Sequence, residues 1–182
     1  MRIDATPVFR IAAALRRRRL AALDPVATQR RTLLGLLRRA AGTRFGRDHG
    51  FTAIADVAAF QRAVPLRRYE AFWTDYWQPA FPRLVDVTWP GLIRHFAVSS
   101  GTTAGRTKYL PLTPEMRRSN VCAAFVMVAH HLAARPHSRM FAGRSLMLGA
   151  GTALVEEAPG IFSGDLSGIA AKTLPVWARG FS

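Results

Sequence analysis

A hydroxyl-rich segment between two apolar stretches contains the residue types in this chain that could do chemistry. It runs from Ser99 to Lys108 (SSGTTAGRTK) and combines serine and threonine hydroxyls with two glycines and a lysine. Glycine lets a backbone approach a phosphate closely, hydroxyls and backbone N–H groups donate to its oxygens, and lysine supplies positive charge. The segment therefore favours phosphate binding, and the alternative interpretation is an ordinary hairpin turn.

The spacing excludes a Walker-type phosphate loop. That loop needs four residues between its two glycines, a lysine directly after the second glycine, and a helix that follows. Here three residues separate Gly101 from Gly105, and Lys108 comes three positions later. The residues that follow, 107–112, are expected to form a strand and not a helix.

The elements expected around this segment are strands at residues 93–98 and 107–112, followed by a helix at 114–134. Thr113 is a helix cap and Pro114 occupies the first helical position. The middle of this helix, 121–132, is nearly all apolar, so we expect it to be buried with Cys122 as a core thiol. A third strand is expected at 145–148 and a short helix from 163.

The chain before the segment is predicted to be helical. Helices are expected over 7–22 and from Pro25 to 41, the second with Asp24 as its cap, and together they suggest a helical hairpin. Residues 43–51 are expected to form a loop and Asp56 to cap a short helix that ends near 63. The aromatic-rich stretch at 69–77 is expected to be helical, with its rings either in the core or available to bind a planar ligand.

Charge is the unusual feature of the composition. Lysine and arginine total 26 of 182 residues against 11 acidic residues, a formal net charge of +15. Residues 1–50 hold twelve arginines and three acids, so nine of these charges lie there. The arginine content is interpreted either as the mark of an arginine-rich genome or as a surface for an anionic partner.

Several classes of protein are excluded. Cys122 is the one cysteine, so the chain has no internal disulfide and no cysteine-based zinc site. His130 and His131 are adjacent and point to different sides of a helix, so no metal site is assigned. No apolar run approaches the length of a membrane span, and the apolar stretch at 11–15 precedes four arginines, the reverse of a secretory signal. These features predict a cytoplasmic protein.

The segment resembles a known phosphate-binding loop. Residues 100–108 look like the Ser-Gly-Thr-Thr-Gly-x-x-Lys loop of the adenylate-forming, acyl-activating superfamily, with Ala104 inserted. A longer form of the pattern, which ends in Lys-x-x-Pro, resembles the auxin-responsive promoter (GH-three) family of acyl-acid amido synthetases, and Lys108 and Pro111 match it. Three further stretches agree with that family: FGRDHGF at 45–51, VPLRRYE at 64–70 and SGDLSGIA at 163–170.

The resemblance implies an α/β fold and a chain that is part of a larger enzyme. It implies an N-terminal helical hairpin at 1–42, followed at 43–182 by a truncated part of the large AMP-binding domain, an incomplete sheet with packed helices. The later nucleotide-site motifs and the small C-terminal domain are absent from the sequence, so the chain is expected to be an N-terminal fragment, inactive alone.

The activity implied by the resemblance is a ligase reaction in two steps. A carboxylic acid is activated by ATP as an acyl-adenylate, and an amine, typically of an amino acid, then forms an amide. The resemblance implies ATP and Mg²⁺ as cofactors, small-molecule acid and amine substrates and no specific nucleic acid. It implies these phosphate-binding residues: Ser99, Ser100, Gly101, Thr102, Thr103, Gly105 and Lys108.

Two other features of the sequence bear on function. Phe125, Met127 and Val128 of the helix at 114–134 are candidates for the acyl-acid pocket, with plain core packing as the alternative, and no residue is assigned a catalytic role. The alternative function is an arginine-rich module that binds nucleic acid or an anionic membrane. A third interpretation is that the chain alone does nothing and exposes strand edges and apolar surface.

Overall fold

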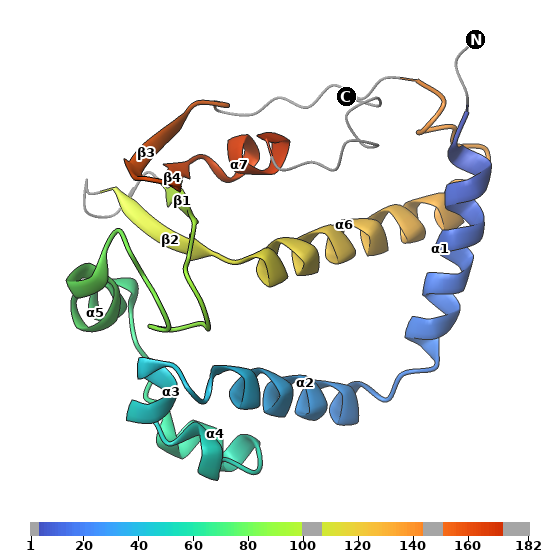
Figure 1. Cartoon of the computed structure of the whole chain (residues 1–182). Helices are drawn as coiled ribbons and strands as arrows, with labels where there is room; N and C mark the ends of the chain where they lie inside the picture. Colours follow the sequence, from blue (N-terminus) through green and yellow to red (C-terminus); the bar gives the residue numbers. More distant parts are fainter. Residues whose placement is uncertain (1–3, 100–106, 144–150, 173–182) are drawn as a thin grey trace. The chain divides into compact units, whose positions relative to one another are not determined.

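The computed structural model describes residues 4–99, 107–143 and 151–172, and these form helices and one sheet. The sheet has four strands in the order β2-β1-β4-β3 (Figure 1). This mixed α/β architecture confirms the predicted fold class. The strands are β1 (His95–Ser99), β2 (Lys108–Leu112), β3 (Leu154–Ala158) and β4 (Ile161–Gly164).

The chain divides into two compact units. The first unit comprises Met1–Leu23, Ala97–Leu154 and Gly164–Ser182, and the second comprises Asp24–Phe96 and Val155–Ser163. The helices of the first unit are α1 (Thr6–Ala21), α6 (Pro114–Ala134) and α7 (Leu166–Lys172). The helical segments of the second are α2 (Pro25–Ala40), α3 (Arg44–Asp48), η1 (Phe51–Ala53), α4 (Val57–Ala63), α5 (Tyr69–Phe72), η2 (Trp73–Trp77) and η3 (Gln78–Ala80).

Side-chain caps set the helix starts that the sequence predicts. The Asp24 carboxylate accepts from the backbone N–H of Ala27 at 3.0 Å, and Thr113 Oγ1 accepts from the N–H of Met116 at the same distance. Asp56 does the same for α4, where it accepts from Ala59 at 2.7 Å. Each cap satisfies a backbone donor that has no partner inside its helix, so these starts follow from local sequence alone.

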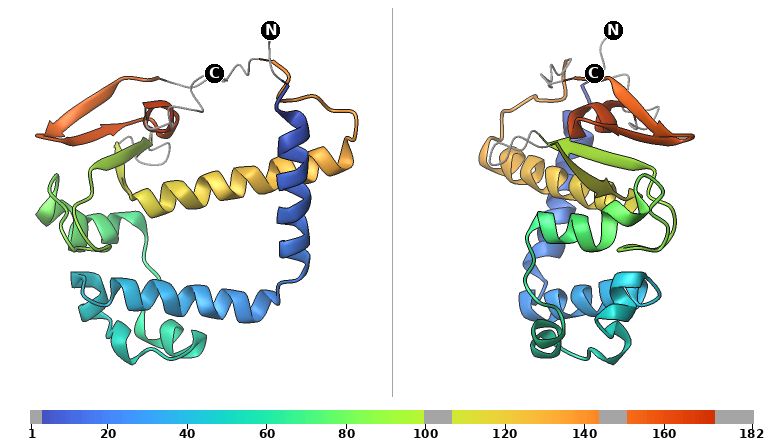
Figure 2. Two further views of the ribbon diagram at one scale, coloured as in Figure 1. Left: turned by 45° about the vertical axis from the view of Figure 1, so that its right-hand side comes forward. Right: turned by 90° about the vertical axis from the view of Figure 1, so that its left-hand side faces the viewer.

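In the first unit, α1 packs across α6 (Figure 2). Ala13 of α1 is buried against Ala129 and Leu132 of α6, and Phe9 stacks on Phe141 with ring centroids 4.1 Å apart. In the second unit, α2 contacts α3 and η1. The predicted helices at 7–22 and 25–41 are therefore confirmed, each with its own packing partners, and the domain division after residue 42 stays a prediction.

The expected burial of α6 is wrong. Val121 and Met127 are 68% and 73% exposed, and Cys122, expected in the core, is exposed as well. The buried residues of α6 are Ala129 and Leu132, near its C-terminal end where α1 packs. An apolar helix is buried only where another element covers it, and among the described residues α1 is the main element that packs on α6.

The structure differs from the sequence-based expectation in two further places. Residues 43–51, expected as a loop, contain α3, because Thr43 Oγ1 accepts from the N–H of Gly46 at 3.0 Å and so caps a short helix. The hairpin of β3 and β4 was not predicted at all, although Pro159 and Gly160 between them are a turn signal, with Gly160 at φ 72°. The strand expected at 145–148 lies outside the described residues.

Gly46 is required by the close approach of α3 to the end of α2. A Cβ atom at this position would overlap the carbonyl oxygen of Ala40, which also accepts from the backbone N–H of Thr43 at 3.0 Å. Because that oxygen belongs to the backbone and is held by this hydrogen bond, α3 itself would have to move. Gly35, in the interior of α2, has nothing within 4 Å of the same position.

We therefore expect Gly46→Ala and Gly35→Ala to change stability in opposite directions. Overpacking at Gly46 lowers the free energy of unfolding by about 2 kcal/mol or more, whereas alanine in place of Gly35 raises it by roughly 0.5–1 kcal/mol because alanine loses less backbone entropy in a helix. Urea unfolding of both variants measures this. Equal stability of Gly46→Ala and the wild type would contradict the packing of α3 on α2.

Candidate functional site

The ends of the hydroxyl-rich segment are held by two adjacent strands. Ser99 is the last residue of β1 and Lys108 is the first of β2, and these strands are neighbours in the sheet. Both side chains are half-buried, and Thr107 is exposed. The sheet therefore brings together the first and last members of the predicted phosphate-binding set. The remaining members, Ser100, Gly101, Thr102, Thr103 and Gly105, lie outside the described residues.

Burial of its side chains on both faces of the sheet fixes the position and register of β1. Successive residues of a strand point to opposite faces, and both Phe96 and Ala97 are buried, at 0% and 8% exposure. Ala97 packs with Leu112 of β2 and with Ile169 of α7. The start of α7 must come close to the backbone near 151, since a Cβ on Gly168 would lie 2.5 Å from the Gly151 carbonyl oxygen. The stretch SGDLSGIA therefore has a packing role beside this sheet.

The candidates for an acyl pocket do not share one side of α6. Phe125 lies 6.3 Å from the ring of Phe9, and Val128 packs against the core formed with α1. Met127, by contrast, is 73% exposed. Two of the three therefore contribute to helix packing, and Met127 is the member available to a ligand.

A second site, which the sequence did not predict, forms around Tyr76. We call it the Tyr76 cluster, and its members come from three segments of the second unit: Arg44, Phe45, Asp48, His49, Arg67, Asp75 and Tyr76. The Tyr76 side chain is 4% exposed and its ring meets Phe45 edge-on at 5.0 Å. The guanidinium carbons of Arg44 and Arg67 lie 5.2 Å and 5.4 Å from the Tyr76 ring centre, within range of cation–π attraction.

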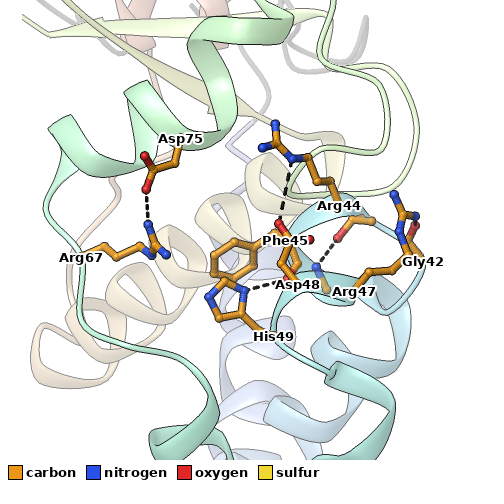
Figure 3. Close-up of polar contacts among 10 residues, drawn as sticks. Gly42, Arg44, Phe45, Arg47, Asp48, His49, Arg67 and Asp75 are labelled. Atoms are coloured by element: carbon orange, nitrogen blue, oxygen red, sulfur yellow. Dashed lines mark hydrogen bonds and ion pairs between the residues drawn. The ribbon is translucent and has the colours of Figure 1, made fainter.

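Ion pairs complete the Tyr76 cluster (Figure 3). Arg67 Nη1 donates to the carboxylate of Asp75, and Arg44 Nε lies 3.9 Å from Asp48 Oδ2. His49 Nδ1 donates to the carbonyl of Phe45 at 2.9 Å, which places the ring proton on that nitrogen. Arg67 Nε is buried and has no hydrogen-bond partner among the described residues. Each arginine is thus held by a carboxylate while its guanidinium lies against the tyrosine.

The Tyr76 cluster explains two of the stretches that resemble the family. FGRDHGF supplies Phe45, Asp48 and His49, and VPLRRYE supplies Arg67. The rings of the aromatic stretch at 69–77 contact one another and Phe45, with Phe72 and Trp77 centroids 5.3 Å apart. Tyr76 is buried and the other four rings are half-buried, so the core interpretation holds for Tyr76. The signal that could have found the cluster was the pairing of basic, acidic and aromatic residues in both stretches.

Within residues 4–99, 107–143 and 151–172, no three His, Cys, Asp or Glu side chains come together in a way that could hold a metal ion.

Known proteins similar to this chain were found by family and by structure. A family model described as the GH3 family N-terminal domain matches residues 14–180. This chain belongs to the GH3 family. A solved structure described as "GH3.15 acyl acid amido synthetase" superposes with a TM-score of 0.62 at 23% sequence identity, over 78% of this chain. The chain spans 25% of the length of that protein, and the likeness shows the fold alone. No curated protein matches the chain.

The Tyr76 cluster predicts a specific pH dependence. Burial raises the pKa of Tyr76 above its usual value of 10.0, and a hydrogen bond with Asp48 and its negative charge raise this pKa further, against the opposing charges of Arg67 and Arg44. The folded chain therefore keeps the phenol proton at a pH where the unfolded chain loses it. The resulting stabilisation is fully present below pH 10.0 and is lost as the pH rises through the folded-state pKa.

We expect Tyr76→Phe to lower the free energy of unfolding by about 1 kcal/mol at pH 7, through loss of one hydrogen bond. We also expect its stability to fall less steeply than that of the wild type between about pH 9 and pH 11. Urea unfolding over this range measures both, and Tyr109→Phe, which leaves the cluster intact, is the control. A Tyr76→Phe profile parallel to that of the wild type would contradict the assignment.

Proposed function

We propose that this chain provides the phosphate-binding segment and part of the large domain of an ATP-dependent acyl-acid amido synthetase. The observation that carries the proposal is the position of Ser99 and Lys108 at the ends of two paired strands, in a chain that belongs to the GH3 family. Such an enzyme activates a carboxylic acid with ATP and joins it to an amine as an amide.

The donor chemistry of the segment suits the phosphates of ATP. In this proposal the Ser99, Ser100, Thr102 and Thr103 hydroxyls donate to phosphate oxygens, Gly101 and Gly105 allow the backbone to approach them, and Lys108 neutralises charge. Activation of a carboxylate increases negative charge on phosphoryl oxygens, so donors already held in place lower the barrier. The strand pairing supports this role because it prevents Ser99 and Lys108 from separating. Mg²⁺ would arrive with the nucleotide.

The acid substrate is proposed to lie along α6. Of the three residues with this assignment, Met127 is exposed, whereas Phe125 and Val128 contact the core formed with α1. We therefore propose that the acid lies on the side of α6 that carries Met127. The flexible thioether of methionine adapts to apolar ligands of different shape, which suits a pocket for an organic acid.

The test is the affinity of the chain for ATP. We expect ATP in the presence of Mg²⁺ to bind, and the double substitution Thr102→Ala and Thr103→Ala to weaken binding at least tenfold, because hydrogen bonds to a charged phosphate contribute about 1.5–3 kcal/mol each. Equilibrium dialysis with labelled ATP measures this. Thr52→Ala is the matched control, since Thr52 is an exposed threonine outside the segment.

The outcomes separate the proposal from the alternatives. Loss of affinity in the double variant, with Thr52→Ala unchanged, supports phosphate binding by the segment. Acid-dependent exchange of pyrophosphate into ATP by a complete enzyme that contains this segment would support the first step, formation of the acyl-adenylate. ATP binding that is equal in the double variant and the wild type would contradict the proposal and leave the segment as a hairpin connection.

A further inference from the structure

One face of α1 is held firmly in the first unit. Ala13 and Phe9 lie in the core with α6, and Arg10 donates to the carbonyl oxygens of Leu132 at 3.1 Å and Ser138 at 2.7 Å. These bonds satisfy carbonyl groups at and just after the end of α6, which have no partner within the helix itself. The opposite face of α1 is therefore presented in a fixed orientation.

That opposite face is apolar and exposed. Val8, Ile11 and Leu15, which we call the outer stripe, are 69%, 67% and 51% exposed. Their spacing of three and four residues aligns them on one side of a helix. At about 100° per residue, they lie roughly 140–160° around the helix axis from Ala13. Single exposed aliphatic residues are common, but three in one row, opposite a packed face, form a surface.

The outer stripe continues into positive charge. Arg18 is the next residue in the same helical row, and Arg19 lies beside it. Neither Asp nor Glu occurs between residues 5 and 23. The surface thus combines an apolar half with a cationic half.

This combination identifies the chemistry of the partner. The phosphates of a nucleic acid would pair with the arginines. The three aliphatic side chains of the outer stripe would then lie against the polar sugar-phosphate backbone. A second copy of the chain would bring the same arginines to this surface, with no Asp or Glu between residues 5 and 23 to pair with them. The surface of a bilayer rich in anionic phospholipid offers phosphate groups to the arginines and an acyl boundary to the aliphatic side chains.

We propose that α1 docks on membranes that contain anionic phospholipid. The outer stripe enters the acyl boundary, and Arg18 and Arg19 contact the headgroups. The association is peripheral: none of the helices in the described part of the chain has both the length and the apolar character needed to cross a bilayer. In this proposal the docking does not depend on ATP, because none of its residues belongs to the hydroxyl-rich segment.

Co-sedimentation of the full chain with vesicles tests the proposal. We expect binding to vesicles of phosphatidylcholine mixed with phosphatidylglycerol, weaker binding at higher salt, and little binding to phosphatidylcholine alone. Ile11→Ser with Leu15→Ser should weaken binding at least tenfold, because several CH₂ groups no longer enter the apolar boundary. Arg18→Gln with Arg19→Gln should weaken it about fivefold for each arginine.

Two matched controls lie on α6. Val121→Ser removes an aliphatic side chain that is 68% exposed, and Arg118→Gln removes an exposed arginine. Both should bind anionic vesicles within about twofold of the wild type, because neither touches the docking surface. Far-ultraviolet circular dichroism verifies that every variant keeps its helices. Weakening confined to the α1 variants supports the proposal.

Three results would overturn it. The first is equal vesicle binding by the wild type and the Ile11→Ser, Leu15→Ser variant, which would show charge attraction without insertion. The second is tighter binding to a DNA duplex than to anionic vesicles, unaffected by the same substitutions, which would assign the arginines to nucleic acid. The third is a dimer in sedimentation equilibrium that the same substitutions dissociate, which would assign the outer stripe to a second copy.

Discussion

The burial of β1 on both faces is the constraint on which the candidate phosphate site depends. Phe96 faces Phe81, with ring centroids 5.2 Å apart, while Ala97 faces Leu112 and Ile169. A strand buried on both sides and paired along both edges cannot shift its register without exposing apolar side chains. Ser99 therefore has a fixed position at the end of β1, and the pairing of β2 gives Lys108 a fixed position beside it.

The stretches that link this chain to the GH3 family have structural roles where they are described. Gly46 permits α3 to approach α2, Arg67 and Asp48 surround Tyr76, and Gly168 permits α7 to approach the chain at Gly151. None of these contacts requires a ligand. They shape the two units, and the chemistry proposed for the chain rests on the hydroxyl-rich segment.

Prediction from sequence succeeded for features that depend on residues close together in the chain. Asp24, Asp56 and Thr113 each cap a helix, because a carboxylate or hydroxyl can reach a free N–H two or three residues ahead whatever the rest of the fold does. The predicted burial of α6 was wrong, because the apolar composition of a helix does not show which other element covers it. Prediction from sequence also missed the Tyr76 cluster, whose members are up to 32 positions apart, Arg44 to Tyr76.

The sequence by itself determined the helix starts, the strands on either side of the hydroxyl-rich segment, the excess of arginine and the resemblance to one family, because each depends on residues that are close together in the chain. Only the tertiary structure decided which faces of α1 and α6 are covered, that two arginines lie against Tyr76, and that Ser99 and Lys108 terminate neighbouring strands. Those features depend on contacts between residues far apart in the chain. Such contacts form only when the chain folds and buries apolar surface between its segments.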